Sequence, residues 1–385
     1  MSAVIRTSDE LRRYAATGVR KLIGEDELRD RFSAVLDRAP MGLISGYAFV
    51  SMPAGPPAWL ETGVECVADE AVTLFATPRT PPPSTDGLQA LPELRLWHRV
   101  GADGEAVCGT RSSHTFVPVR SARLFLAAGV VDVEAMMADS PLETGEFVAP
   151  PLERCVLVIR WADDPHAGLK ALCAEAGADA DVGALLDSEL ARYESTIELP
   201  SGWEYPAYGG PQEQFAGDTR RTERPIIGCY TRAAAAVLRK DAPLPLLPGT
   251  KLRWAWRIQQ LPSRVREDSV ATHDYLSIAL EFDNGRDLSY YWSAELPVDT
   301  GYQCPLPGWG HRETHVVIRC GMEGLGEWHN EERDVYADYS RHVGEPPSRI
   351  IRVWLLAVTP FQPSEGQCDY AGIELDNGSS LLRVN

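Results

Sequence analysis

The sequence predicts a mainly β protein with two β-sandwich domains and short helical segments at the N-terminus and between the domains. The 385 residues exceed the size of one ordinary domain. Short apolar runs rich in β-branched and aromatic residues recur along both halves, and the 32 glycines and 29 prolines fall between them as turn formers. With 44% hydrophobic and 24% charged residues, both halves can bury a core.

The net charge of −18 argues against nucleic acid and anionic membrane surfaces as partners, because both need a basic patch. The chain contains no apolar run of about 18 residues, so no membrane span is predicted. The first 24 residues lack the apolar core and cleavage site of a signal peptide, which predicts a cytoplasmic, bacterial-type protein. The eight cysteines form no CxxC pair and are expected to be free, buried thiols.

The first segment, residues 1–40, is predicted to be helical. Apolar residues recur at helical spacing within residues 7–39, Thr7 or Ser8 can cap the first helix, and Pro40 ends the second. We expect these helices to cap the fold or to form a homodimer contact. They also leave open a structural or assembly role for the protein.

Residues 41–162 are predicted to form the first sandwich. Its expected strands are Leu43–Ser51, Val64–Val67, Ala71–Ala76, Leu94–Val100, His114–Pro118, Leu124–Ala128 and Cys155–Trp161. The proline-rich stretch Ala76–Pro92 is expected to be a loop, because proline cannot occupy a central strand.

Three short motifs of this half, Trp59–Val64, Leu96–Gly101 and Leu124–Ala128, resemble the galactose-binding, lectin-like sandwiches of bacterial lectins and carbohydrate-active enzymes. The resemblance implies a β-sandwich that binds sugars. The calcium-binding acidic cluster of that family has no clear counterpart in these residues.

Residues 163–199 are predicted to be a helical connector. Asp163 or Asp164 can cap a first helix that has Pro165 in its first turn, and a second helix is expected at Val182–Tyr193. The Gly-, Pro- and aromatic-rich residues 200–225 are expected to be an ordered loop into the second domain.

Residues 200–385 are predicted to form a second, jelly-roll-like sandwich. Its expected strands are Ile226–Thr231, Leu252–Ile258, His273–Phe282, Leu288–Ser293, Thr314–Cys320, Ile350–Val358 and Tyr370–Leu375. The tripeptide Asp283-Asn284-Gly285 predicts a tight hairpin turn within residues 273–293. Glu331–Val343 is expected to be a helix that ends before Gly344.

The order and spacing of motifs across residues 200–378 resemble an uncharacterised bacterial β-sandwich family that carries only the label of a domain of unknown function. The motifs that carry the resemblance are Leu252–Arg257, His273–Tyr275, Tyr290–Ser293, Trp328 with Glu331–Tyr339, and Tyr370–Leu375. That family more often has an acidic residue where His273 stands. The resemblance implies a fold and no activity.

Side chains alternate between the two faces of a strand, so the apolar face of each strand predicts which polar residues lie opposite. If the polar faces coincide, one sheet surface presents the residues Arg257, His273, Tyr275, Glu281, His315, Arg319 and Trp354. His273, Tyr275 and Glu281 would then act as acid or base, while an arginine holds a developing negative charge. Trp309 and Trp328, in turn-rich loops, could stack on a sugar ring. The alternative is that these polar residues form an ordinary solvated sheet face.

No organic cofactor and no metal site are predicted. His311 and His315 are four residues apart on an expected strand, which separates them by about 13 Å, and no HExxH motif occurs. A structural calcium ion at the acidic turn Asp283–Asp287 stays open.

For function, the sequence predicts a cofactor-independent enzyme (lyase, isomerase, cyclase or hydrolase) that acts on a sugar-like or cyclic small molecule by acid–base catalysis in the second sandwich. A non-catalytic, lectin-like carbohydrate-binding protein and a structural protein remain as alternatives.

Overall fold

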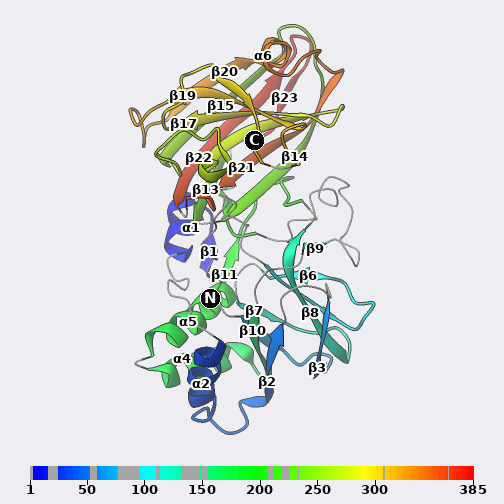
Figure 1. Ribbon diagram of the computed structural model, residues 1–385, viewed down its shortest axis with the longest axis vertical. Helices are drawn as coiled ribbons and strands as arrows, with labels where there is room; N and C mark the ends of the chain where they lie inside the picture. Colours follow the sequence, from blue (N-terminus) through cyan, green and yellow to red (C-terminus); the bar gives the residue numbers. More distant parts are fainter. Residues whose placement is uncertain are drawn as a thin grey trace.

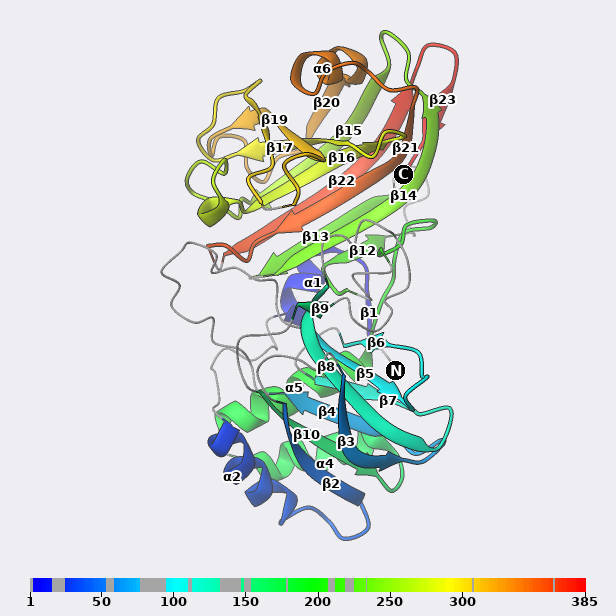
Figure 2. The same ribbon diagram turned by 45° about the vertical axis from the view of Figure 1, so that its right-hand side comes forward.

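The computed structural model of the chain forms an N-terminal and a C-terminal sandwich stacked along the long axis (Figures 1 and 2). The residues that the structure describes are 3–15, 25–52, 59–76, 95–109, 113–131, 147–148, 154–177, 179–206, 212–218, 225–232, 234–306, 308–362 and 364–385. Almost all of the predicted loop Ala76–Pro92 lies outside them. No helix of the described part is long and apolar enough to cross a membrane.

The N-terminal sandwich pairs two sheets over an apolar core that includes Leu74, Leu126 and Val158. The first sheet has the order β2-β10-β4-β7, from β2 (Ile44–Met52), β10 (Arg154–Trp161), β4 (Val72–Ala76) and β7 (Ser113–Phe116). The second has the order β3-β8-β5-β6, with β9 paired to β8, from β3 (Leu60–Cys66), β8 (Ala122–Val131), β5 (Arg95–Val100), β6 (Val107–Cys108) and β9 (Phe147–Val148).

Three helices cover the other face of the first of these sheets. They are α2 (Glu25–Leu36), α4 (Pro165–Ala176) and α5 (Ala180–Glu194). Phe32, Phe75 and Trp161 are fully buried in the core between these helices and the sheet. As predicted, Pro165 begins α4, and the side chain of Asp164 caps it by accepting from the backbone N–H groups of residues 166 and 167.

The C-terminal sandwich is larger and consists of two sheets that enclose a core with Trp254, Trp256 and Tyr290. One sheet has the order β12-β13-β22-β15-β20, with β23 paired to β22, from β12 (Phe215–Asp218), β13 (Ile226–Arg232), β22 (Glu365–Asp376), β15 (Lys251–Gln260), β20 (His329–Asp334) and β23 (Leu381–Arg383). The other has the order β14-β21-β16-β17-β19-β18, from β14 (Ala235–Pro245), β21 (Arg349–Val358), β16 (Tyr275–Phe282), β17 (Asp287–Ser293), β19 (Glu313–Cys320) and β18 (Gly301–Gln303).

The two N-terminal helices pack on different sandwiches. Helix α1 (Ser8–Ala15) lies against β12, β13 and β22 of the C-terminal sandwich, where Leu11 and Tyr14 are buried. Helix α2 packs on the N-terminal sandwich. Between the sandwiches, β1 (Ala3–Ile5) pairs in parallel with β11 (Ser195–Ile197), so the start of the chain is tied to the connector.

The two sandwiches contact each other through a small apolar cluster. Trp97 of β5 and Ala127 of β8 pack against Ala279 of β16 and Trp354 of β21. The face of the β14-β21-β16-β17-β19-β18 sheet that points away from the C-terminal core therefore faces the N-terminal sandwich. This explains why every residue of β16 and β17 is buried although only one face of each strand packs into the core.

The observed elements confirm the mainly β fold. The predicted hairpin is present, with Leu280 opposite Leu288 across β16 and β17. The predicted helix Glu331–Val343 is too long, because residues 329–334 form β20 and only α6 (Val335–His342) is helical. Strand β14 was not predicted, since its sequence carries two prolines and three charged residues, yet it pairs with β21 along most of its length.

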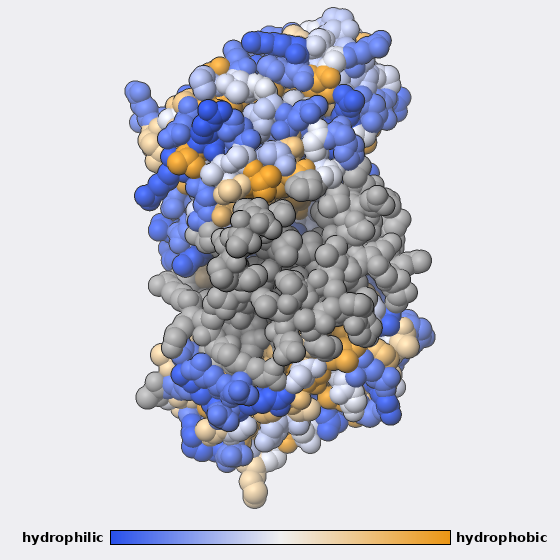
Figure 3. All heavy atoms as spheres, viewed as in Figure 1, coloured by the Kyte–Doolittle hydropathy of each residue, from blue (hydrophilic) through white to orange (hydrophobic). Residues whose placement is uncertain are grey.

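On the face that Figure 3 shows, the described parts of both sandwiches are mostly hydrophilic with scattered hydrophobic residues. The cysteines differ in part from the prediction. Cys66, Cys155, Cys229, Cys304 and Cys368 are buried, as predicted, but Cys320 is exposed and Cys173 is half-buried.

Candidate functional site

The candidate site lies on the outer face of the β14-β21-β16-β17-β19-β18 sheet, which we call the polar face. On β16, the side chains of Leu276, Ile278 and Leu280 enter the core. Alternation places the intervening residues Tyr275, Ser277, Ala279 and Glu281 on the polar face, and all four are buried. A buried sheet face that carries hydroxyl and carboxyl groups is unusual, because polar groups lose hydration when they leave water.

Strand register arranges the polar face in rows. Asp287 pairs with Glu281 of β16 and with Glu313 of β19, so three carboxyl groups lie side by side on adjacent strands. In the neighbouring row, Ser289 pairs with Ala279 and with His315. The two rows are two residues apart, a separation of about 7 Å along a strand.

The row of carboxyl groups is held by two arginines and a tryptophan, and we call Glu281, Asp287, Arg312, Arg352 and Trp354 the carboxyl cluster. Arg312 donates from Nε to Asp287 Oδ2 at 2.7 Å and from Nη2 to Glu281 Oε1 at 3.4 Å. Glu281 Oε2 also accepts from Arg352 Nη1 at 3.1 Å and from Trp354 Nε1 at 2.9 Å.

Two indole rings flank Arg312. The carbon of its guanidinium group lies 5.7 Å from the ring centroid of Trp309 and 5.7 Å from that of Trp354, within cation–π range. With two aromatic neighbours and two carboxylate partners, Arg312 is fixed in position at the centre of the cluster.

Burial changes the protonation of two of these carboxyl groups. It raises the pKa of Asp287 to about 7, although the nearby Arg312 opposes the shift. It raises the pKa of Glu313 to about 8, and the neighbouring charge of Asp287 adds to the increase. Asp287 can therefore exchange a proton near neutral pH, which is a requirement for a general acid or base.

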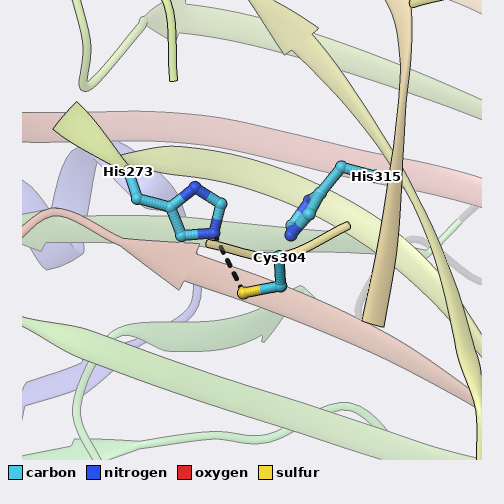
Figure 4. A group of neighbouring side chains, drawn as sticks. All are labelled: His273, Cys304 and His315. Atoms are coloured by element: carbon cyan, nitrogen blue, oxygen red, sulfur yellow. Dashed lines mark hydrogen bonds between the residues drawn. The ribbon is translucent and has the colours of Figure 1, made fainter. Parts of the chain in front are cut away.

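The second group on this side of the sheet is the histidine cluster, formed by His273, Cys304 and His315. One ligand-type atom of each residue lies within 4.8 Å of the others, and all three residues are buried. Figure 4 shows the two imidazoles and the thiol pointing toward one another, with the 3.4 Å contact between His273 Nε2 and Cys304 Sγ drawn as a dashed line.

Each member of the histidine cluster comes from a different part of the fold. His273 ends the 3-10 helix Val270–Thr272 just before β16, Cys304 follows β18, and His315 lies within β19. The Nδ1 of His273 lies 2.7 Å from the backbone carbonyl oxygen of Glu267. An N–H at Nδ1 donates this bond, which leaves the lone pair of Nε2 directed at Cys304.

Aromatic rings and acidic groups surround the histidine cluster. Tyr302 stacks on His315 with 5.2 Å between ring centroids, and the hydroxyl of Tyr275 donates to Glu313 Oε1 at 3.4 Å. Burial lowers the pKa of His273 to about 4 and that of His315 well below its usual value. Both imidazoles are therefore neutral at neutral pH, and the 3.6 Å approach of His315 Nε2 to Glu313 Oε1 is not an ion pair.

Several buried polar atoms on the polar face have no hydrogen-bond partner among the described residues. They are Ser277 Oγ, Ser289 Oγ, Asp287 Oδ1 and both ring nitrogens of His315. A buried polar atom without a partner costs about 1–3 kcal/mol, so these atoms are available to bind a polar ligand or ordered water.

The structure brings together part of the predicted site. His273, Tyr275, Glu281, His315 and Trp354 lie on or beside the polar face, and Trp309 contacts it through Arg312. However, Glu281 lies near the C-terminal end of β16, in the carboxyl cluster. Tyr275 begins β16 and His273 precedes it, so both lie at the opposite end of this strand. The predicted single acid–base group of His273, Tyr275 and Glu281 is thus divided between two clusters.

Arg257 and Arg319 are not on the polar face, and their predicted placement was wrong, whereas Trp328 lies in a loop as predicted but away from the polar face. Arg257 belongs to β15 in the other sheet, where it donates to Asp369 and lies 5.5 Å from the Trp328 ring. Arg319 lies beyond a register shift in the pairing of β17 with β19, and this irregularity turns it toward Glu331 and Trp292.

Sequence reasoning missed Asp287, Arg312, Glu313 and Cys304. The Asp283-Asn284-Gly285 turn was a usable signal for Asp287, because a hairpin closed there sets it opposite Glu281. No local sequence pattern predicts that Cys304 lies in the site, because it is 31 positions from His273 in the chain. The expectation of no metal site considered only local spacing, and the fold assembles His273, Cys304 and His315 from separate strands and loops. In the turn where calcium was considered, Asp283 accepts from Ser348 and Asp287 from Arg312.

Comparison with known proteins identifies the C-terminal sandwich by family. Residues 202–374 match the family model described as "Protein of unknown function (DUF3047)". The C-terminal sandwich is therefore similar to this family over the matched residues. The match confirms the resemblance expected for residues 200–378, and the polar face lies entirely within the matched residues.

No curated protein matches the chain. Among solved structures, the xyloglucanase domain of NopAA from Sinorhizobium fredii in complex with cellobiose is 8% identical, with 46% of this chain and 95% of that chain covered and a TM-score of 0.29. TmCBM61 in complex with β-1,4-galactotriose is 12% identical, with 48% and 89% covered and a TM-score of 0.20. The CBM22-1-CBM22-2 tandem from Paenibacillus barcinonensis Xyn10C is 10% identical, with 88% and 95% covered and a TM-score of 0.23.

Proposed function

We propose that the protein is an acid–base enzyme that cleaves a bond to oxygen in a small, neutral, sugar-like substrate bound on the polar face of the C-terminal sandwich. The observation that carries the proposal is the set of buried atoms without hydrogen-bond partners among the described residues, at Ser277, Ser289 and Asp287. A ligand with several hydroxyl groups both donates and accepts, and so can satisfy hydroxyl and carboxyl groups together.

Asp287 is the proposed acid–base group. Its Oδ2 is fixed by Arg312, while its Oδ1 has no protein partner and can face the substrate. Because its pKa is raised to about 7, it can protonate a leaving oxygen and then regain the proton from an attacking water molecule. The bond between carbon and the leaving oxygen breaks, and the water oxygen forms the new bond to carbon.

Glu281 has a positioning role in this proposal. It binds Arg312, Arg352 and Trp354 at the same time and thereby keeps Arg312 against Asp287. The placement of the polar face against the N-terminal sandwich favours a small substrate over a polymer, because Asp287 is only 7% exposed.

A panel of 4-nitrophenyl glycosides of glucose, galactose and xylose tests the proposal with the purified full chain. We expect turnover of at least one substrate and a decrease in kcat of about 100-fold or more in Asp287→Asn, the usual contribution of a general acid or base. Ser289→Ala is expected to raise KM, because it removes a hydrogen-bond donor to the substrate.

Trp328→Ala is the matched control, since Trp328 is 40% exposed and lies away from the polar face. Its kinetics should equal those of the wild type. Turnover that survives in Asp287→Asn would refute the assignment of Asp287. Saturable binding of the free sugars without turnover would instead support the non-catalytic, carbohydrate-binding alternative and refute the enzyme.

A further inference from the structure

The histidine cluster has the composition and spacing of a transition-metal site. We propose that His273, Cys304 and His315 bind a zinc ion, a property that goes beyond the proposed function. Thiolate and imidazole are the side-chain ligands that zinc prefers, and three such ligands with a fourth, exchangeable position form a recurrent zinc geometry.

The distances fit this geometry. Tetrahedral zinc with bonds of roughly 2.0–2.3 Å places its nitrogen and sulfur ligands about 3.4–3.6 Å apart. His273 Nε2 and Cys304 Sγ are 3.4 Å apart, and the ligand atoms of all three residues lie within 4.8 Å of one another. Small side-chain rotations therefore suffice to close the three residues around one ion.

A second observation comes from His315. Its side chain is completely buried, yet neither ring nitrogen has a hydrogen-bond partner among the described residues. A neutral imidazole carries one N–H donor and one lone-pair acceptor. In a buried ring without a partner, both groups lose their hydrogen bonds to water, and neither loss is offset. A metal bond to one nitrogen explains why a histidine is kept at this position.

A third observation is the orientation of His273. Zinc-bound histidines almost always donate their other ring N–H to a carbonyl or carboxylate, which fixes the tautomer and the ring. The Nδ1 of His273 makes this bond to the carbonyl oxygen of Glu267 at 2.7 Å, and so Nε2 is the nitrogen presented to Cys304.

The fourth position of the site lies beside Glu313, whose Oε1 is 3.6 Å from His315 Nε2. Either this carboxyl group or a water molecule can complete the tetrahedron. Cys304 binds as the thiolate, so zinc binding releases the thiol proton to solvent.

The test uses the full chain, freed of metal with a chelator and then titrated with Co²⁺ as a spectroscopic probe of the zinc site. We expect one equivalent of Co²⁺ to bind with a thiolate-to-cobalt charge-transfer band, and one equivalent of Zn²⁺ to abolish that band. In elemental analysis of the protein as purified, we expect about one zinc per chain.

Cys304→Ser and His315→Gln should each weaken Co²⁺ binding by at least about 100-fold, since even loss of a supporting hydrogen bond to a zinc ligand costs 10–100-fold. The matched controls are Cys320→Ser and His311→Gln, which change an exposed cysteine and an exposed histidine near the same strand. Both should bind like the wild type.

A wild-type chain without stoichiometric zinc and without a cobalt thiolate band overturns the proposal even if a variant fails to fold. Retention of the band in Cys304→Ser overturns it as well. These experiments measure metal binding and not turnover. The zinc proposal can therefore be refuted while the acid–base proposal holds, and the acid–base proposal can be refuted while the zinc proposal holds.

Discussion

Glu281 and Asp287 lie directly opposite each other across the β16–β17 hairpin, and Arg312 donates a hydrogen bond to each of them. Two carboxylates this close would repel each other, and the positive charge of the Arg312 guanidinium offsets that repulsion. The relationship joins the fold of the C-terminal sandwich to its candidate chemistry, since the hairpin register creates the pair that Arg312 then fixes.

The first prediction concerns the stability that this pair provides. Glu281→Gln removes the carboxylate that the buried Arg312 and the half-buried Arg352 share, so we expect the free energy of unfolding to fall by about 3 kcal/mol. Urea denaturation measures the change. Arg123→Gln, which removes an exposed arginine beside Glu61 and Glu65, should leave the free energy of unfolding nearly unchanged and serves as the control.

The second prediction concerns the pH dependence caused by Asp287, which faces Arg312, Arg352, Glu281 and Glu313. Its pKa is about 7 in the folded protein against an unfolded value near 3.8. A raised pKa means that the folded state holds this proton more tightly, so its stabilising contribution is complete below about pH 3.8 and is lost as the pH rises through 7.

Asp287→Asn cannot ionise, so between pH 5 and pH 8.5 its free energy of unfolding should fall less than that of the wild type. Chemical denaturation at several pH values measures both. Parallel curves for the two proteins would show that Asp287 does not titrate in this range.

The third prediction concerns acid sensitivity of the N-terminal sandwich. The ring centroids of the buried His98 and the half-buried His114 lie 5.3 Å apart, and burial lowers the pKa of each to about 3. A lowered histidine pKa gives stability that is present above the unfolded value near 6.5 and is lost as the pH falls toward 3.

His98→Leu removes one of these groups and should lower the acid sensitivity, measured as the decrease in Tm between pH 7 and pH 4 by scanning calorimetry. His311→Gln changes an exposed histidine and should leave the decrease unchanged. An equal loss of Tm in wild type and His98→Leu would contradict the prediction.

The fourth prediction compares two glycines in neighbouring helices. A Cβ at Gly168 of α4 would overlap the ring of Trp161, whereas a Cβ at Gly183 of α5 would meet no atom within 4 Å. Alanine is favoured over glycine in a helix by about 1 kcal/mol. Gly183→Ala should therefore raise Tm, and Gly168→Ala should lower it because the overlap outweighs helix propensity. The Tm of each variant is measured by thermal unfolding monitored with circular dichroism. A rise of Tm in both variants would show that Trp161 can move aside.

The fifth prediction concerns the contact between the sandwiches. Ala279 is buried between the two domains beside Trp97 and Trp354, so Ala279→Phe should overpack the contact. We expect the variant to unfold in two calorimetric steps where the wild type unfolds in one, while Ala279→Ser behaves as the wild type. A single transition in Ala279→Phe would show that the sandwiches do not depend on this contact.

The sequence by itself determined the local features of this protein. Alternation of apolar and polar residues predicted most strands and assigned Leu276, Ile278 and Leu280 to the core, and the Asp283-Asn284-Gly285 turn predicted the hairpin. These features depend on neighbours in the chain, so the pattern of residues is enough to reveal them.

Only the tertiary structure decided which strands are neighbours and hence which side chains meet. The parallel pairing of β17 with β19 sets Ser289 beside His315 and Asp287 beside Glu313, and the path through β18 brings Cys304 to His273. Such pairings join residues that are distant in sequence, and their register depends on the packing of the whole sandwich rather than on any local pattern. For this reason the polar face could be predicted in outline, whereas its two clusters and the placement of Arg257 and Arg319 could not.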